Sequence, residues 1–296
     1  MLVCEPIEMS LDNISVSLPE DDAPAWDGVT AWGLGAWVVR GHRIFESMIA
    51  DNTGIDPAAV DQSKVSAEWL EVQYTNAFRA FDGVLDNPTV GAENIVIDIT
   101  VADSFDVLGL FGVRAVSVSV AFYNAAGQQV GERSLSLGGR IVSSWLEWFT
   151  VRPDPRRDKA FFYNIPVSAR RAVIRIDGGD LRLGEVFLGR SFYVGEAQPK
   201  TAGRAVTASR YEVNDFGRTI WTKRPTRREM TYIVEAERLA FEAIEPRMGE
   251  LAGSLVVTVG AFEIPSTIQF GILGTIDWAE DGPDEYLYSF TIKGLS

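Results

Sequence analysis

The sequence predicts a mainly β protein with three parts: a small aromatic-rich module, an antiparallel, jelly-roll-like β-sandwich, and a C-terminal α+β section with one helix. Three observations indicate this class. Apolar residues alternate at period two in several short runs, and turn residues separate these runs. Only one stretch, near the C-terminus, has a helical period. Short alternating strands with frequent turns favour stacked antiparallel sheets over an α/β fold.

The chain divides into four segments. Residues 1–22 are interpreted as an arm or short strand that leads into an acidic, proline-bounded linker, and we expect the arm to become ordered on a partner. Residues 23–75 form the aromatic module, residues 76–200 the β-sandwich and residues 201–296 a C-terminal section.

Strands of the sandwich follow from alternation. "NIVIDITV" and "RAVSVSVAFY" alternate at period two, and "NAAGQQ" supplies a turn before "VGERSLSL". "AVIRID", a Gly-Gly turn and "LRLGEVFLG" predict a further strand pair with a bend.

The C-terminal section contains the helical pattern. Ala240, Ile244, Met248 and Leu251 fall on one face, and Pro246 is expected to end or kink the helix. The strand "SLVVTVG" follows, and "STIQFGILGTIDW" with "YLYSFTIKGL" predicts a closing hairpin.

Charge is distributed unevenly. The chain has a net charge of −14. Residues 1–110 hold 4 Lys/Arg against 19 Asp/Glu, a net of −15, whereas residues 111–296 hold 23 against 22, a net of +1. The overall charge argues against nucleic acid and anionic membranes as partners. The asymmetry favours complementary contacts between neighbouring subunits.

The number of cysteines and the N-terminal residues indicate the cellular compartment in which the protein folds. Cys4 is the single cysteine, so no internal disulfide forms, and the first residues lack the basic and apolar regions of a signal peptide. We therefore expect folding in a cytoplasm. The longest apolar runs, such as "VLGLFGV", are too short for membrane insertion.

Catalytic motifs are not found in the sequence. His42 is the single histidine, and there is no Gly-x-Ser-x-Gly elbow, P-loop or zinc-ligand set. We predict a protein that is not an enzyme and that uses no cofactor or metal. A glycosidase stays open as an alternative, because it needs only two carboxylates.

A basic run, "TKRPTRRE", has two readings. Lys223, Arg224, Arg227 and Arg228 either lie on an exposed strand or loop, or contact an acidic face of a neighbouring subunit. Nucleic-acid binding is disfavoured, because no aromatic stacking platform interleaves with these cations.

Residues 23–75 are rich in large rings: Trp26, Trp32, Trp37, Phe45 and Trp69. A module of this size needs large rings to build a core, but an exposed ring can also stack on a sugar face. We assign most of the five rings to the core and keep open that one or two face a glycan. Trp32 and Trp69 are the favoured candidates.

The module resembles the small chitin- and cellulose-binding-type modules that accompany glycoside hydrolases. The matching positions are Trp26, Trp32, Gly35, Val38, Phe45, Glu46, Asn52, Pro57 and Trp69. Ala36 replaces an acid of that pattern, and Phe45 replaces a tyrosine. The resemblance implies that exposed rings stack on sugars.

Over residues 23–296 the chain loosely resembles a group of tail-tip proteins from long-tailed bacteriophages, which pair a sugar-module-like N-terminal segment with a jelly-roll-like sandwich. The likeness rests on the order of several motifs: Trp145, Trp148, Phe149, Arg156, Arg157, Ile174, residues 184–195, Asp215, Phe216, Gly217 and Arg224. It implies a structural subunit of the tail tip or baseplate, located in the virion tail after folding in the host cytoplasm. Its partners would be other tail proteins in a symmetric oligomer, and host-surface polysaccharide is a further candidate. A carbohydrate-binding protein that acts through residues 23–75 is the alternative function.

Overall fold

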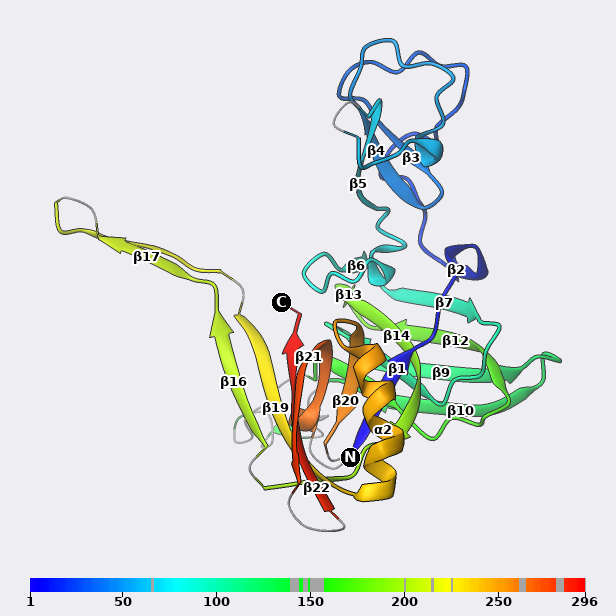
Figure 1. Cartoon of the computed structure of the whole chain (residues 1–296). Coiled ribbons are helices and arrows are strands. Elements are labelled where there is room, and N and C mark those ends of the chain that lie inside the picture. The colour runs from blue at the N-terminus through cyan, green and yellow to red at the C-terminus, as the bar shows by residue number, and fades with distance from the viewer. Residues whose placement is uncertain are drawn as a thin grey trace. The chain divides into compact units, whose positions relative to one another are not determined.

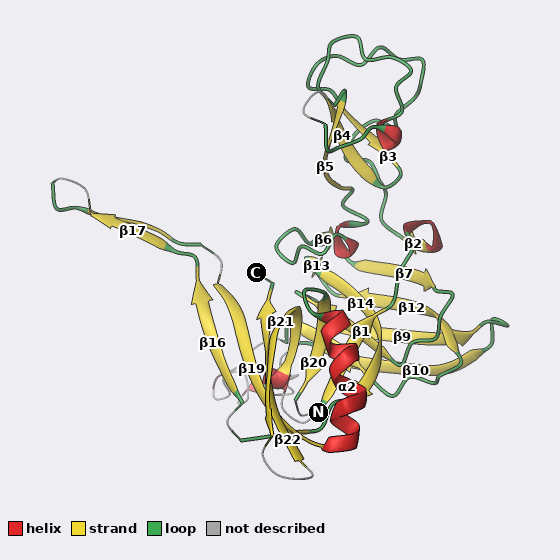
Figure 2. Ribbon diagram, in the orientation of Figure 1, coloured by secondary structure: helices red, strands yellow, loops and turns green. Residues whose placement is uncertain are grey.

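The part of the chain that the structure describes is mainly β and contains one long helix, as the sequence predicts. The computed structural model describes residues 1–64, 67–138, 144–145, 149, 157–199, 201–213, 216–224, 226–260, 265–280 and 285–295. Figure 2 shows strands in every part of the chain. Among the positions that carry the phage resemblance, Trp148, Arg156 and Asp215 lie outside the described residues.

The chain forms two compact units and passes between them several times. Unit 1 comprises Met1–Ile7, Phe105–Val107 and Leu188–Ser296. Unit 2 comprises Glu8–Ser104 and Leu108–Phe187. Each unit is therefore assembled from segments that are distant in the sequence.

Unit 1 is built on an antiparallel sheet with the strand order β14-β1-β20-β21-β22-β19-β15, and β16 also pairs with β19 (Figure 1). Its strands are β1 (Leu2–Pro6), β14 (Glu185–Tyr193, which begins in unit 2), β15 (Glu196–Ala197), β16 (Ala202–Thr207), β17 (Arg210–Val213), β18 (Thr219–Thr222), β19 (Thr226–Glu237), β20 (Leu255–Val259), β21 (Ile268–Glu280) and β22 (Glu285–Gly294). The predicted closing hairpin is β21–β22.

Of the two readings of the N-terminal residues, the short strand is confirmed, and this strand is ordered in the chain's own sheet rather than on a partner. Strand β1 pairs with β14 on one side and β20 on the other. Val3 and Cys4 are fully buried. The apolar run "LVC" is too short to identify as a central strand from sequence, because its partners lie about 190 and 255 residues further along the chain.

Helix α2 (Arg238–Leu251) covers one face of this sheet through Phe241, Ile244 and Met248. Ile244 and Met248 were predicted on that face, but Phe241 takes the place of the exposed Ala240. Pro246 lies inside the helix and does not end it. Its ring is exposed, so the carbonyl that loses a hydrogen bond can be hydrated.

A two-stranded ribbon, β17–β18, belongs to unit 1. Both strands are exposed along their whole length, and within the described chain the pair forms a sheet of its own. Tyr211 faces Trp221 across the ladder. The ribbon follows β16 and precedes β19, and β17 projects beyond them (Figure 1).

Unit 2 contains a five-stranded antiparallel sheet with the order β10-β9-β12-β7-β2. Its strands outside the aromatic module are β2 (Ile14–Val16), β6 (Thr89–Gly91), β7 (Asn94–Thr100), β8 (Val107–Phe111, whose first residue belongs to unit 1), β9 (Ser117–Asn124), β10 (Gln129–Ser136), β11 (Lys159–Phe162), β12 (Ala169–Asp177) and β13 (Leu181–Leu183). Ile97, Ile174 and Val120 lie side by side and are fully buried, whereas their chain neighbours are more exposed. This alternation is the one read from the sequence.

Two sequence-predicted turns occur as expected. Asn124 accepts hydrogen bonds from Ala126 and Gln128 through its side chain and joins β9 to β10. The bend in "LRLGEVFLG" falls at Gly184, between β13 and β14. The expected strand pair with "AVIRID" is wrong, because β12 pairs with β7 and β9, whereas β13 pairs with β6 and β14 with β1. A side chain there would meet the carbonyl oxygens of Leu85 and Phe111 at 2.9 and 3.0 Å, so the bend requires glycine.

The aromatic module is a three-stranded antiparallel sheet of β3 (Trp37–Arg40), β4 (Arg43–Ser47) and β5 (Trp69–Tyr74). Gly41 and His42 both have positive φ and form the two-residue turn between β3 and β4. Four 3-10 turns complete the described elements: η1 (Leu11–Asn13), η2 (Pro57–Ala59), η3 (Arg79–Phe81) and η4 (Pro265–Thr267).

Candidate functional site

The inner face of the three-stranded sheet holds the core of the aromatic module. Val38, Phe45 and Trp69 form one buried cluster, and Trp26 and Trp32 pack against it. Trp69 has no exposed surface, and its indole N–H donates to the Ile55 carbonyl at 2.9 Å. Because both faces of a fully buried ring are occupied by protein, Trp69 and Phe45 serve the core in this conformation.

Trp26 and Trp32 are half-buried. The guanidinium of Arg40 lies 5.1 Å from the centre of the Trp26 ring and covers that ring. Trp32 donates its indole N–H to the Asp27 carbonyl at 3.3 Å and exchanges two backbone hydrogen bonds with Asn52. Both tryptophans therefore stabilise the loops around the sheet through packing and hydrogen bonds.

Trp37 is the ring of the five that is exposed, at 44%. It alternates with Val38 on β3, so it points away from the core. Glu46 lies opposite Trp37 across β3–β4, and Leu70 lies opposite Glu46 across β4–β5. Cross-strand partners share a face, so a ring, a carboxylate and an apolar side chain form one row on the outer face.

Further exposed apolar residues lie on the chain segments that adjoin β3 and β4. Leu34, Met48 and Ile49 are exposed. Backbone hydrogen bonds from Gly35 to the Ser47 carbonyl, at 2.7 Å, and from Met48 to the Glu68 carbonyl, at 2.9 Å, hold their segments together. We call the row of Trp37, Glu46 and Leu70, together with Leu34, Met48 and Ile49 on the adjoining segments, the outer-face patch. Several exposed apolar side chains on neighbouring segments of a folded surface are typical of a binding site.

The buried Asn52 fixes the loops next to the patch. Its amide nitrogen donates to Ser47 Oγ at 3.2 Å and to the Glu68 carbonyl at 3.1 Å. Asn52 is 1% exposed, so these bonds are shielded from water. The loops that carry Met48 and Ile49 are thereby held in place before any ligand arrives.

The four cations of the basic run are all exposed. Lys223 and Arg224 connect β18 to β19, and Arg227 and Arg228 lie on β19 opposite β16. Arg227 pairs with the buried Glu229 at 3.0 Å, and Arg204 pairs with the same carboxylate at 2.5 Å. These arginines hold the pKa of Glu229 below its usual range. Contact with a neighbouring subunit stays a prediction.

Within the described ranges, no three His, Cys, Asp or Glu side chains gather in a way that could hold a metal ion. His42 contacts Glu20 through Nδ1 at 2.8 Å and stacks on Phe78 at 3.8 Å. No helix in the described residues is long and apolar enough to span a membrane.

Comparisons with known proteins do not assign the chain to a family. No protein-family model matches the chain, and no curated protein matches it. The lectin domain of lectinolysin complexed with Lewis B antigen is similar at 17% identity and a TM-score of 0.27, over 38% of this chain and 82% of that chain. A histidine mutant of the same domain, complexed with Lewis b, gives 17% and 0.28, over 39% and 83%. At these values the likeness carries no argument about this chain's fold or function.

The sequence analysis does not identify the outer-face patch, because it favours Trp32 and Trp69 over Trp37 as glycan-facing rings. Two signals could have found it. The alternation in "WVVR" places Trp37 opposite in direction to Val38, and the Gly41-His42 turn sets Trp37 against Glu46. The loop residues Leu34, Met48 and Ile49 carry no such periodic signal.

Proposed function

We propose that this protein binds carbohydrate through the outer-face patch, with Trp37 as the stacking ring. The observation that carries the proposal is the exposed Trp37 ring beside the Glu46 carboxylate on a rigid sheet face. The C–H groups of a sugar face pack on an aromatic ring, and a carboxylate accepts hydrogen bonds from sugar hydroxyls. Leu70, in the same cross-strand row, adds an exposed apolar side chain.

Rigidity supports this assignment. A ring on a strand loses little freedom when a ligand binds, and the neighbouring loops are already tied through Asn52 and Ser47. The binding residues therefore need little rearrangement.

A glycan array followed by calorimetry on the full chain tests the proposal. Trp37→Ala should weaken binding of the best glycan about tenfold or more, because the stacking surface is lost. Glu46→Gln should weaken it less, because the amide still accepts one hydrogen bond. The matched control is Trp221→Ala, since Trp221 is an exposed tryptophan in the other unit. Unchanged affinity in the folded Trp37→Ala protein would exclude stacking by this ring.

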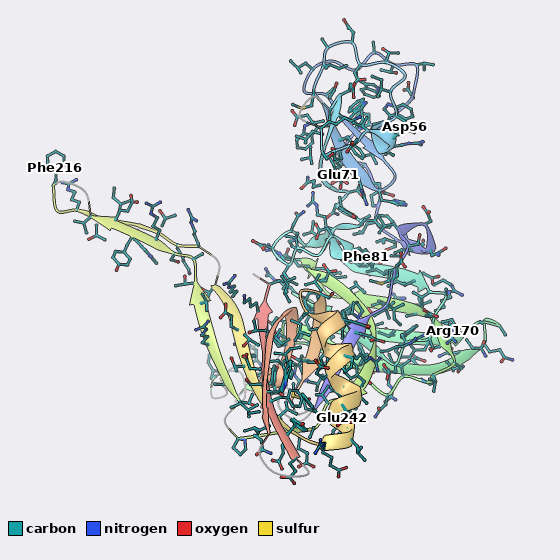
Figure 3. All side chains as sticks on the ribbon, viewed as in Figure 1. Asp56, Glu71, Phe81, Arg170, Phe216 and Glu242 are labelled. Carbon is teal, nitrogen blue, oxygen red and sulfur yellow. The ribbon has the colours of Figure 1, made fainter. Side chains whose placement is uncertain are left out.

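A structural subunit of a phage tail tip or baseplate is the second candidate, and the β17–β18 ribbon favours it. Tyr211 and Trp221 are 75% and 66% exposed, and Phe216 at the turn is 90% exposed (Figure 3). An isolated two-stranded ribbon is marginal in water, so large exposed rings on it suit contact with another protein. The adjoining cations Lys223 and Arg224 complement an acidic subunit surface.

Two measurements test the second candidate. Sedimentation of the purified chain should show oligomers that dissociate as salt is raised, and that are lost when Tyr211 and Trp221 are both changed to Ser. Electron microscopy of purified particles should place the protein in the tail. A monomer at all salt concentrations, together with its absence from tails, would remove this function.

A further inference from the structure

We propose a second saccharide site, in a hollow on the other side of the aromatic module, that recognises a neutral, hydroxyl-rich ring by hydrogen bonds rather than by stacking. The hollow has a volume of about 470 Å³. It lies among η1, the β3–β4 turn, η2 and the start of β5, and its lining includes Ser10, Asp12, Arg40, Arg43, Gln62 and Glu71. The inference rests on the proposed function in one respect, which is that the ligand is a carbohydrate.

Two guanidinium groups are held rigidly at this hollow. Arg40 donates from Nε and Nη2 to the two carboxylate oxygens of Asp56, at 3.2 and 2.8 Å. Arg43 donates from Nη1 to Glu71 at 2.9 Å and from Nη2 to the Tyr74 hydroxyl at 3.2 Å. Figure 3 shows Asp56 and Glu71 in this same module. Because these hydrogen bonds fix both guanidinium groups, their remaining N–H donors lie at fixed positions.

Acceptors line the same hollow. The Asp12 carboxylate and the Ser10 hydroxyl come from the chain segment at η1, and both residues are exposed. Gln62 is oriented by the Glu71 amide, which donates to its side-chain oxygen at 2.9 Å. Donors from β3 and β4 therefore face the same space as acceptors from η1. Adjacent sugar hydroxyls both donate and accept, so they suit a mixed set of this kind.

The charge balance of the hollow and the burial of Phe45 indicate which class of ligand the hollow can bind. Arg40 and Arg43 are each neutralised by a carboxylate, and Asp12 adds a negative charge, so the hollow does not favour phosphate or sulfate. The Arg40 hydrogen bonds keep the pKa of Asp56 low, which maintains this pairing. Phe45 is 2% exposed, so no open ring is offered for stacking. A neutral monosaccharide unit with neighbouring hydroxyls fits this chemistry.

Amide NMR on the full chain tests the site, with methyl glycosides of glucose, galactose and mannose as probes and inorganic sulfate as the charged comparison. We expect at least one neutral glycoside to shift the backbone amides of Gly41 and Ala58 and the side-chain amide of Gln62. Asp12→Asn should weaken this binding about tenfold. Glu8→Gln is the matched control, because Glu8 is an exposed acid on the same segment outside the hollow.

The Trp37→Ala background separates this inference from the proposed function. Persistence of the Gly41, Ala58 and Gln62 shifts in that variant, with loss of binding at the outer-face patch, supports two independent sites. Loss of every shift in folded Trp37→Ala overturns the second site and leaves the first. Stronger shifts with sulfate than with the glycosides, or no shifts with any of them at tens of millimolar, also overturn it.

Discussion

Glu185 is a buried carboxylic acid of unit 2, and its surroundings disfavour its charged form. Burial, with the nearby Asp82, raises its pKa from 4.5 to about 8, although the Gly83 amide donates to it at 3.0 Å. Between these two pKa values the folded state binds more protons than the unfolded state. The free energy of unfolding should therefore fall as the pH rises from about 4.5 to about 8.

Replacing this side chain gives the first prediction. Glu185→Gln should remove most of that fall, about 5 kcal/mol at most, because the amide stays neutral at every pH. Urea denaturation at a series of pH values measures the difference. Glu132→Gln, an exposed acid of the same unit, is the control. An unchanged pH slope in Glu185→Gln would contradict the burial of a protonated acid.

Cys4 gives a prediction about reactivity. Its side chain is fully buried in the sheet of unit 1, and burial raises its pKa well above the usual range. The thiolate is the reactive form, so a thiol reagent should label the native protein very slowly and the urea-unfolded protein at once. Mass spectrometry of the labelled chain measures both rates. Rapid native labelling would show that β1 leaves the sheet.

At this scale the sequence identified ring types but not which ring faces solvent. Trp37, Trp69 and Phe45 have similar hydrophobicity, and their exposure differs because of strand direction and register. Register depends on pairing between β4 and β5, which are separated by a long loop. Alternation in β3 could have placed Trp37 on the outer face, but short-range patterns do not encode the β4–β5 pairing that places Trp69 in the core.

A few buried side chains pack helix α2 against the sheet and stabilise it there. Phe241 packs against Tyr286 at 4.7 Å and against Tyr288 at 5.2 Å between ring centres. Phe241→Ala should lower the free energy of unfolding by about 3–5 kcal/mol, because it leaves a cavity among these rings. Leu239→Ala, at a position that is 82% exposed, should change it little. Chemical denaturation of both variants checks this, and equal losses would mean that the helix is not packed on the sheet.

The helix itself was predictable and its end was not. Ile244 and Met248 lie four residues apart and are both buried, as the helical period predicts. The local cost of proline at Pro246 was outweighed by Met248 and Leu251, which pack on the sheet one turn further on. Packing that overrides local preference cannot be read from the helix sequence alone.

At the scale of the whole molecule, unit 1 depends on a strand from the other end of the chain. A fragment of residues 188–296 lacks β1 and so exposes the facing edges of β14 and β20. We expect this fragment to melt without cooperativity or to aggregate. Adding a peptide of residues 1–7 should restore a cooperative transition, because the missing strand can pair in its place. Circular dichroism with and without the peptide measures this, and a cooperative melt of the fragment alone would contradict it.

The sequence by itself determined the fold class, several strand positions, the turn at Asn124 and the bend at Gly184, because alternation, helical period and turn chemistry act over a few residues. Tertiary structure decided which strands pair, that residues 2–6 lie at the centre of a sheet, and that Trp37 rather than Trp69 meets solvent. These outcomes depend on contacts between residues far apart in the chain. Their energies arise from burial and register, which exist only once the sheets have formed.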